Sequence, residues 1–172
     1  LSAIHVIIGM KGDYTLIHPN DDVNCGQSTN DVIPTAGKIT ALHLLEQVHK
    51  QLLRLYQAFL IKAEEFNDVI KMGRTQLQDA VPIRLGQEFK AYAAAVKRDL
   101  ERIYKVMDEL RSVNLGGTAI GTGLNADIQY LQKIVPTLTK ITGIKLTQAE
   151  DLIDSTQNLD SFVLVSGVIK TC

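Results

Sequence analysis

Apolar side chains recur at intervals of three and four residues along two long stretches of the chain. The positions of the first stretch are Leu45, Val48, Leu52, Leu55, Phe59, Ala63 and Phe66. This period of about 3.5 residues predicts a helix over 38–66, about 43 Å long. The second stretch predicts a helix over 85–110 from Leu85, Phe89, Tyr92, Val96, Leu100, Ile103, Met107 and Leu110. Helices of this length need neighbours along most of their surface.

Two shorter helical patterns follow at 128–141 and 159–169, with Gly143 as a helix stop between them. No alternating run bounded by Asn-Gly or Asp-Gly predicts a strand pair, and residues 71–82 are interpreted as a polar loop. The sequence therefore predicts an all-α fold, in which long antiparallel helices form part of a helical bundle with polar loops at its ends. Because two such helices leave their far faces exposed, we expect the chain to oligomerise.

The polar residues Ser28, Thr29, Asn30 and Asp31 stand just before an expected helix N-terminus. Two hydroxyls and an amide beside a helix N-terminus form a donor-rich site that favours a carboxylate. The same residue types also form an ordinary N-cap, with Asn30 or Asp31 as the capping residue and Pro34 in the first helical turn. The residues alone leave both interpretations open.

Two further polar segments have their own alternatives. In residues 75–79 the Thr and Gln side chains can bind a polar ligand or satisfy their own loop. Residues 114–125 hold four of the chain's 12 glycines but match neither GxGxxG after a strand nor GK[ST], which argues against nucleotide binding. Glycine there is expected to permit positive φ and a close backbone approach to a substrate or a neighbouring subunit.

Composition and charge exclude several classes of protein and of binding partner. A chain of 172 residues, 45% hydrophobic and 22% charged, is one globular domain or a piece of a larger one, not a disordered, collagenous or disulfide-rich chain. With 18 basic and 19 acidic residues it offers no electrostatic case for nucleic acid or an anionic membrane. The start at Leu1 without Met, and the stop just after the apolar run 162–169, suggest an excised fragment.

The sequence indicates neither a targeting or membrane-spanning segment nor a metal site. No apolar run is long enough to span a bilayer, and the run at 4–10 lacks the flanks of a signal peptide. Cys25 and Cys172 are expected to be unpaired thiols in a reducing compartment, which makes the cytoplasm the expected location. The histidines have no metal-site spacing, and no nucleophile–His–acid triad is visible.

Three long strings carry a family resemblance. They are His-Pro-Asn-Asp-Asp-Val-Asn-Cys-Gly-Gln-Ser-Thr-Asn-Asp (18–31), Lys-Met-Gly-Arg-Thr-Gln-Leu-Gln-Asp-Ala-Val-Pro (71–82) with Leu-Gly-Gln-Glu-Phe (85–89), and Gly-Gly-Thr-Ala-Ile-Gly-Thr-Gly-Leu-Asn (116–125). In this order and spacing they resemble the fumarase/aspartase superfamily of lyases, over nearly the whole chain. The resemblance favours ligand binding over the purely structural interpretations of 18–31 and 73–79.

Within the superfamily the chain resembles the aspartate ammonia-lyase branch. Ser-Thr-Asn-Asp stands where typical fumarases carry Ser-Ser-Asn-Asp, Gln76 stands where they carry His, and residues 149–153 resemble the aspartase version of that segment. Hydroxide is a poor leaving group that benefits from a general acid, whereas an ammonium group leaves as neutral ammonia. A neutral amide at position 76 can orient a substrate but cannot carry a proton.

The resemblance implies a reaction and a set of roles. The family eliminates a group reversibly and in the anti sense across a Cα–Cβ bond, through an enediolate dianion, to give fumarate. Ser28, Thr29 and Asn30 would bind a substrate carboxylate and the dianion, and Thr75 and Gln76 would contact the other end of the substrate. A second anion site would involve His18, Asn20 and Asp21, and Asn125, which closes the glycine-rich loop, would support the site indirectly.

The resemblance also implies what lies elsewhere. The family's base is a serine on a mobile loop with a Gly-Ser-Ser signature, which these 172 residues lack together with an upstream substrate-binding segment. The family's site is assembled from three subunits of a homotetramer, so we expect residues 1–172, a piece of the central helical domain, to be inactive alone. No cofactor is implied. The alternatives are a fumarate hydratase, another superfamily lyase, or a non-catalytic helical scaffold.

Overall fold

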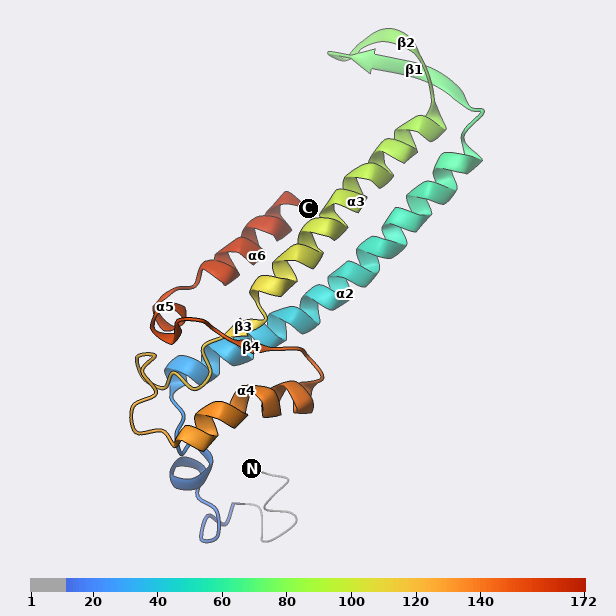
Figure 1. Cartoon of the computed structure of the whole chain (residues 1–172). Coiled ribbons are helices and arrows are strands. Elements are labelled where there is room, and N and C mark those ends of the chain that lie inside the picture. Colours follow the sequence, from blue (N-terminus) through green and yellow to red (C-terminus); the bar gives the residue numbers. More distant parts are fainter. Residues whose placement is uncertain (1–11) are drawn as a thin grey trace. The chain divides into compact units, whose positions relative to one another are not determined.

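A computed structural model describes residues 12–172, so the apolar run at 4–10 lies outside the described residues. The described chain is mostly helical, which confirms the all-α class (Figure 1). In order, the elements are η1 (Pro19–Val23, a short π-helix), α2 (Thr29–Glu65), β1 (Ile70–Thr75), β2 (Gln78–Arg84), α3 (Leu85–Glu109), β3 (Ser112–Val113), α4 (Ile128–Thr142), β4 (Thr147–Gln148), α5 (Leu152–Gln157) and α6 (Asp160–Thr171).

The chain divides into two compact units. The first comprises the residues up to Ile39 together with Arg111–Leu159, and the second comprises Thr40–Leu110 together with Asp160–Cys172. Helix α2 begins in the first unit and continues through the second. No helix in the described part of the chain is both long enough and apolar enough to cross a membrane.

In the second unit the later turns of α2 pair with α3 through aromatic side chains. The ring centroids of Phe66, the residue directly after α2, and Phe89 lie 5.4 Å apart, and those of Phe59 and Tyr92 lie 5.7 Å apart. Because positions later in α2 meet positions earlier in α3, the two helices are antiparallel, as predicted. Gly86 permits this pairing, since a Cβ there would collide with the carbonyl oxygen of Ala63.

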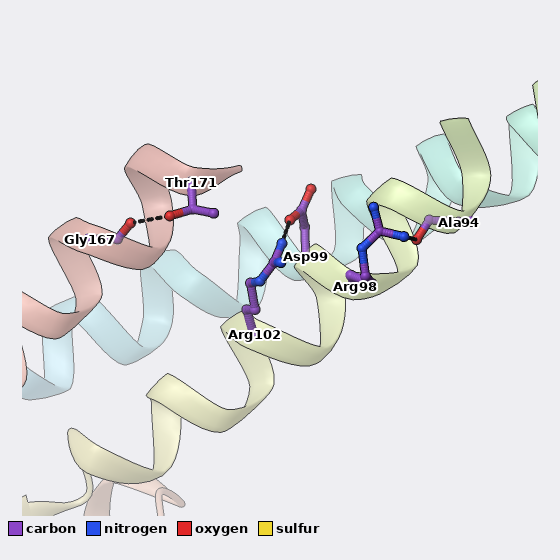
Figure 2. A network of polar contacts seen from close by, with 6 residues as sticks. All are labelled: Ala94, Arg98, Asp99, Arg102, Gly167 and Thr171. Atoms are coloured by element: carbon purple, nitrogen blue, oxygen red, sulfur yellow. Dashed lines mark hydrogen bonds and ion pairs between the residues drawn. The ribbon is translucent and has the colours of Figure 1, made fainter. Parts of the chain in front are cut away.

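Helix α3 supplies most of the core of the second unit. Its buried residues are Gly86, Ala93, Val96, Leu100, Ile103, Val106 and Met107. Helix α6 lies beside α3 and buries Ser161 and Val165. Figure 2 shows polar contacts on the two helices, including an ion pair of 2.6 Å between Arg102 and Asp99 on α3.

The predicted apolar stripe of α2 is only partly core. Leu45 is buried, but the side chains of Val48 and Leu55 are each 42% exposed. Further apolar side chains project into solvent from other faces of α2, Ile61 being 66% exposed. Contacts inside the described chain therefore leave apolar surface along α2 uncovered.

The prediction of a polar loop at 71–82, with no strand pair, is wrong. Strands β1 and β2 form an antiparallel hairpin in which Ile70 pairs with Arg84 and Thr75 with Gln78. The two-residue turn is Gln76-Leu77, with φ of +50° and +65°. This geometry is usually supplied by Asn-Gly or Asp-Gly. Because the turn carries neither, the usual sequence signal for a hairpin is missing.

The first unit is held together by short elements. A parallel bridge joins β3 to β4, pairing Ser112 with Thr147. Helix α4 begins after the capping side chain of Asp127 and ends at Gly143, whose φ of +71° confirms the predicted helix stop. Helix α5, which the sequence did not predict, begins after the capping side chain of Asp151.

Candidate functional site

The start of α2 is capped by Ser28. Its Oγ accepts the backbone N–H of Asn30 at 3.2 Å, and its own N–H donates to Oδ1 of Asp31 at 3.0 Å. This reciprocal pair resembles a capping box, with the N–H of the second helical residue bonded to the cap side chain in place of the third. The N-cap prediction was therefore right in kind but wrong in position, since neither Asn30 nor Asp31 is the cap, and the helix starts at Thr29 rather than at residue 38.

A cavity of about 420 Å³ lies beside this cap. It is lined by Asn24, Gln27, Ser28, Thr29, Val32 and Ile33. The Ser28 hydroxyl is engaged in the cap, whereas the exposed Thr29 hydroxyl has no hydrogen-bond partner among the described residues. The capping and ligand-binding interpretations are thus compatible, because they use different side chains.

Asp31 is the most heavily engaged polar side chain of this region. It is fully buried, and its Oδ2 accepts the N–H groups of Gly116 at 3.1 Å and Thr118 at 3.0 Å, in addition to the bond from Ser28 to Oδ1. One carboxylate thus joins the start of α2 to the glycine-rich loop. The sequence pattern indicated only the local cap, because no local signal marks partners more than 80 residues away.

A second long-range contact replaces the hydrogen bond that Pro34 cannot donate. Pro34 lies inside α2 rather than in the predicted first turn. Because proline has no N–H, the carbonyl of Asn30 loses its helical donor. Asn114, only 1% exposed, donates from Nδ2 to that carbonyl at 2.9 Å and to Oγ1 of Thr156 at 3.1 Å. The side chain of Asn30 itself donates from Nδ2 to the carbonyl of Ala119 at 2.7 Å.

The glycine-rich loop approaches other backbone closely. Gly121 has a φ of +94°, and a Cβ there would lie 2.5 Å from the backbone nitrogen of Ile153. Thr118 and Asn125, both non-glycine, also adopt positive φ, +59° and +67°. The predicted conformational role of the loop is confirmed, and in this chain the approached backbone belongs to α5. The expected contact with a substrate or another subunit stays a prediction.

Tyr130 lies near this network. Its hydroxyl is buried and has no hydrogen-bond partner among the described residues. Burial raises the pKa of the Tyr130 phenol, and the negative charge of Asp31 raises it further. Both effects disfavour the phenolate, so Tyr130 stays neutral beside Asp31.

The side chain of His18 makes its contacts within its own turn. Its Nδ1 accepts the N–H of Asp21 at 3.2 Å and lies 3.1 Å from Oδ2 of Asp21, while its backbone N–H donates to Oδ2 of Asp22 at 2.7 Å. Asn20 is exposed in the same turn. A free anion would meet two carboxylates here, so the second anion site stays a prediction with no added support.

Thr75 and Gln76 lie at the exposed tip of the hairpin. An ion pair of 3.1 Å between Arg74 and Asp79 links the strands behind them. Left-handed backbone at a non-glycine residue such as Gln76 costs free energy, and such strain often marks functional positions. These two residues belong to the second unit and Ser28 to the first, so their joint contact with one ligand stays a prediction.

Two further observations within residues 12–172 concern metal binding and a second cavity. No group of three or more His, Cys, Asp or Glu side chains there is arranged to hold a metal ion. A cavity of about 860 Å³ in the second unit is lined by residues of α3 and α6 and contains none of the predicted site residues.

Comparisons with known proteins agree with the family resemblance. A family model described as "Lyase" matches residues 2–172. Aspartate ammonia-lyase of Bacillus subtilis is 50% identical over 170 residues, which are 99% of this chain and 36% of the relative. A fumarate lyase:delta crystallin structure from Brucella melitensis superimposes with a TM-score of 0.93 at 48% identity, covering 98% of this chain and 36% of that one.

A class II fumarase from Schistosoma mansoni has a TM-score of 0.87 at 31% identity, covering 97% of this chain and 38% of the fumarase chain. The chain therefore spans a little over a third of the length of the relatives that it matches.

Proposed function

Because the chain belongs to the lyase family of the fumarase/aspartase superfamily, we propose that it is part of an aspartate ammonia-lyase. The observation that carries the proposal is the identity of 50% to a protein named aspartate ammonia-lyase, against 31% to a fumarase. The residue at position 76 supports the same choice, since Gln replaces the His that typical fumarases carry.

The proposed reaction converts L-aspartate reversibly into fumarate and ammonia. A base takes the Cβ proton, and the electron pair of that C–H bond moves into the adjacent carboxylate to give an enediolate dianion. That pair then forms the C=C bond while the Cα–N bond breaks and its electrons leave with ammonia. The family's base is a serine on a mobile loop that carries a Gly-Ser-Ser signature, and these 172 residues contain no such string.

Ser28, Thr29 and Asn30 would act on the substrate carboxylate and on the dianion. Two observations support this assignment: Ser28 and Thr29 line a cavity of about 420 Å³, and the Thr29 hydroxyl has no other partner among the described residues. The dianion concentrates charge, so each well-placed donor would lower the barrier by about 2.7–4 kcal/mol.

Thr75 and Gln76 would contact the opposite end of the substrate. Their exposed place at the hairpin tip leaves both side chains available to a ligand. Because ammonia departs as a neutral molecule, this end needs an orienting hydrogen bond rather than a proton donor, and an amide provides that. Substitution Gln76→His tests the role: we expect deamination to fall without a gain in fumarate hydration. A gain in hydration with deamination intact would contradict the orienting role.

We propose that the full-length protein is a homotetramer with its site shared between subunits. The exposed apolar side chains of α2, such as Leu44 at 56% and Ile61 at 66%, support an assembly that covers them. Residues 1–172 alone would then be inactive. Size-exclusion chromatography with light scattering tests the assembly, and a monomeric, fully active protein would contradict it.

The experiment that tests the function uses the full-length protein containing this chain. Ultraviolet absorbance follows fumarate formation from L-aspartate and, separately, from L-malate. We expect product from L-aspartate only. Product from L-malate only would identify a fumarate hydratase, and no product from either substrate would favour another substrate or a structural protein.

A further inference from the structure

We propose that Asp31 is a positioning residue for Asn30: by holding residues 116–119 of the glycine-rich loop, it keeps one amide N–H of Asn30 directed to the ligand. The proposal rests on the proposed function in one respect, since it takes Asn30 as a substrate-binding residue. Asp31 itself touches no ligand in this account.

The first step is the attachment of the loop to Asp31. A fully buried carboxylate is costly unless its oxygens are paired, and Asp31 has three backbone N–H donors. Two of them, from Gly116 and Thr118, meet the same oxygen at 3.1 and 3.0 Å. Hydrogen bonds to a charged acceptor are roughly twice as strong as neutral ones. The Asp31 carboxylate therefore fixes the backbone on both sides of Gly117.

The second step leads from the loop back to Asn30. Ala119 directly follows Thr118, and its carbonyl accepts a hydrogen bond from Nδ2 of Asn30 at 2.7 Å. A primary amide has two N–H donors on that nitrogen and one acceptor oxygen. With one N–H held by Ala119, the flip state of the amide is set and the second N–H remains for a carboxylate. Without Ala119 in place, the amide could rotate and present its oxygen, which repels a carboxylate.

The third step is the backbone of Asn30. Asn114 holds the Asn30 carbonyl at 2.9 Å, in place of the donor that Pro34 lacks. The backbone and the side chain of Asn30 are therefore anchored by two different parts of the 114–119 segment. Movement of that segment would change the direction of the Asn30 amide, and Asp31 is the charged group that resists such movement.

A double-mutant cycle in the full-length protein tests the proposal. The variants are Asp31→Asn, Asn30→Ala and their combination, with Asp151→Asn as the matched control. Asp151 also accepts two backbone N–H bonds through one oxygen, from Ile153 and Asp154, but it is exposed and does not hold the loop. Each variant is assayed for kcat, KM, the dissociation constant of fumarate and the thermal midpoint.

If Asp31 acts through Asn30, Asp31→Asn should lower kcat/KM and fumarate affinity about tenfold or more. The double variant should lie within about threefold of Asn30→Ala alone, because the same interaction is lost only once. Asp151→Asn should stay within about threefold of the unchanged protein. Losses that multiply in the double variant, or equal effects of Asp31→Asn and Asp151→Asn, would overturn the proposal.

The outcomes separate this proposal from the proposed function. Turnover of L-aspartate by the unchanged protein decides the function, while the cycle in fumarate affinity decides the role of Asp31, even in a protein that does not turn over L-aspartate. Absence of both turnover and fumarate binding overturns both. If Asp31→Asn does not fold, Asp31→Glu replaces it in the cycle, since its charge is kept but its extra methylene displaces the loop. If neither folds, Asp31 acts on folding alone and the proposal is wrong.

Discussion

Substitution Gly121→Ala probes the close approach of the glycine-rich loop to α5. The added Cβ would lie 2.5 Å from both the nitrogen of Ile153 and the carbonyl oxygen of Leu152, and closer still to Cα of Ile153. All three neighbours are backbone atoms, so no side-chain rotation relieves the collision. Gly121 also has a φ of +94°, where an L side chain is strained.

The expected cost has two parts. Positive φ at a residue with a Cβ costs about 1–2 kcal/mol. Clearing the collision requires backbone to shift, because the added Cβ would lie no more than 2.5 Å from backbone atoms, and overpacking of this kind costs about 1–3 kcal/mol. Gly121→Ala should therefore lower the free energy of unfolding by about 2–5 kcal/mol. Gly143→Ala is the matched control, because Gly143 has a φ of +71° but nothing within 4 Å of the added Cβ.

Urea unfolding of the full-length protein, followed by far-ultraviolet circular dichroism, measures both variants. We expect Gly143→Ala to lose only the strain of about 1–2 kcal/mol, and Gly121→Ala to lose clearly more. Equal stability of the two variants would show that α5 does not press against the loop as described. A fully stable Gly121→Ala protein would refute the assignment of this loop as a conformational device.

Substitutions at three further positions are tested by the same unfolding measurement. Asn114→Ala leaves the Asn30 carbonyl and the Thr156 hydroxyl without their donor and should cost about 1–3 kcal/mol. Asn114→Asp keeps the size but places a buried carboxylate against the Asn30 carbonyl, so it should cost at least as much, and a stable Asp variant would contradict the reasoning. Tyr130→Phe removes a buried hydroxyl without a partner among the described residues and should stabilise by about 1 kcal/mol near neutral pH. Burial raises the pKa of Tyr130 from its ordinary value of 10.0, so the unfolded chain loses the phenolic proton first and the free energy of unfolding falls as the pH rises above 10.0. The Tyr130→Phe protein should lose less stability over this pH range. An equal pH dependence of the two proteins would contradict this reasoning. Leu77→Gly relieves a φ of +65° at a side chain that is 92% exposed and should stabilise by about 0.5–1 kcal/mol, whereas a loss would mean that an assembled partner buries Leu77.

Much of the fold could be predicted from apolar periodicity. The predicted helix at 85–110 closely matches Leu85–Glu109, and the one at 128–141 matches Ile128–Thr142. The apolar stripe alone indicated a start of α2 at residue 38, whereas the predicted N-cap at Asn30 or Asp31 lies within three residues of the observed cap, Ser28. Pro34 lies deeper in α2 than the predicted first turn, and the donor that replaces its missing N–H comes from Asn114, far along the chain. The hairpin was missed because left-handed Gln76 and Leu77 carry no glycine signal.

The candidate site could also be predicted only in part, because some of its contacts join residues far apart in the sequence. Local sequence indicated an N-cap at Asn30 or Asp31, whereas the cap is Ser28, and it indicated the conformational role of the loop glycines, which is present. It could not indicate Asp31 as a link to Gly116 and Thr118, since hydrogen bonds to backbone N–H groups place no demand on the partner's residue type. The roles of Thr75 and Gln76 came from family resemblance rather than from spacing, and they remain to be tested.

The most direct test runs the proposed reaction backwards in one vessel. The full-length protein is incubated with fumarate and ammonium in water, so that ammonia and water compete for the same double bond, and proton NMR quantifies the products. An aspartate ammonia-lyase forms L-aspartate without L-malate. Accumulation of L-malate instead, or of neither product, would contradict the proposed function.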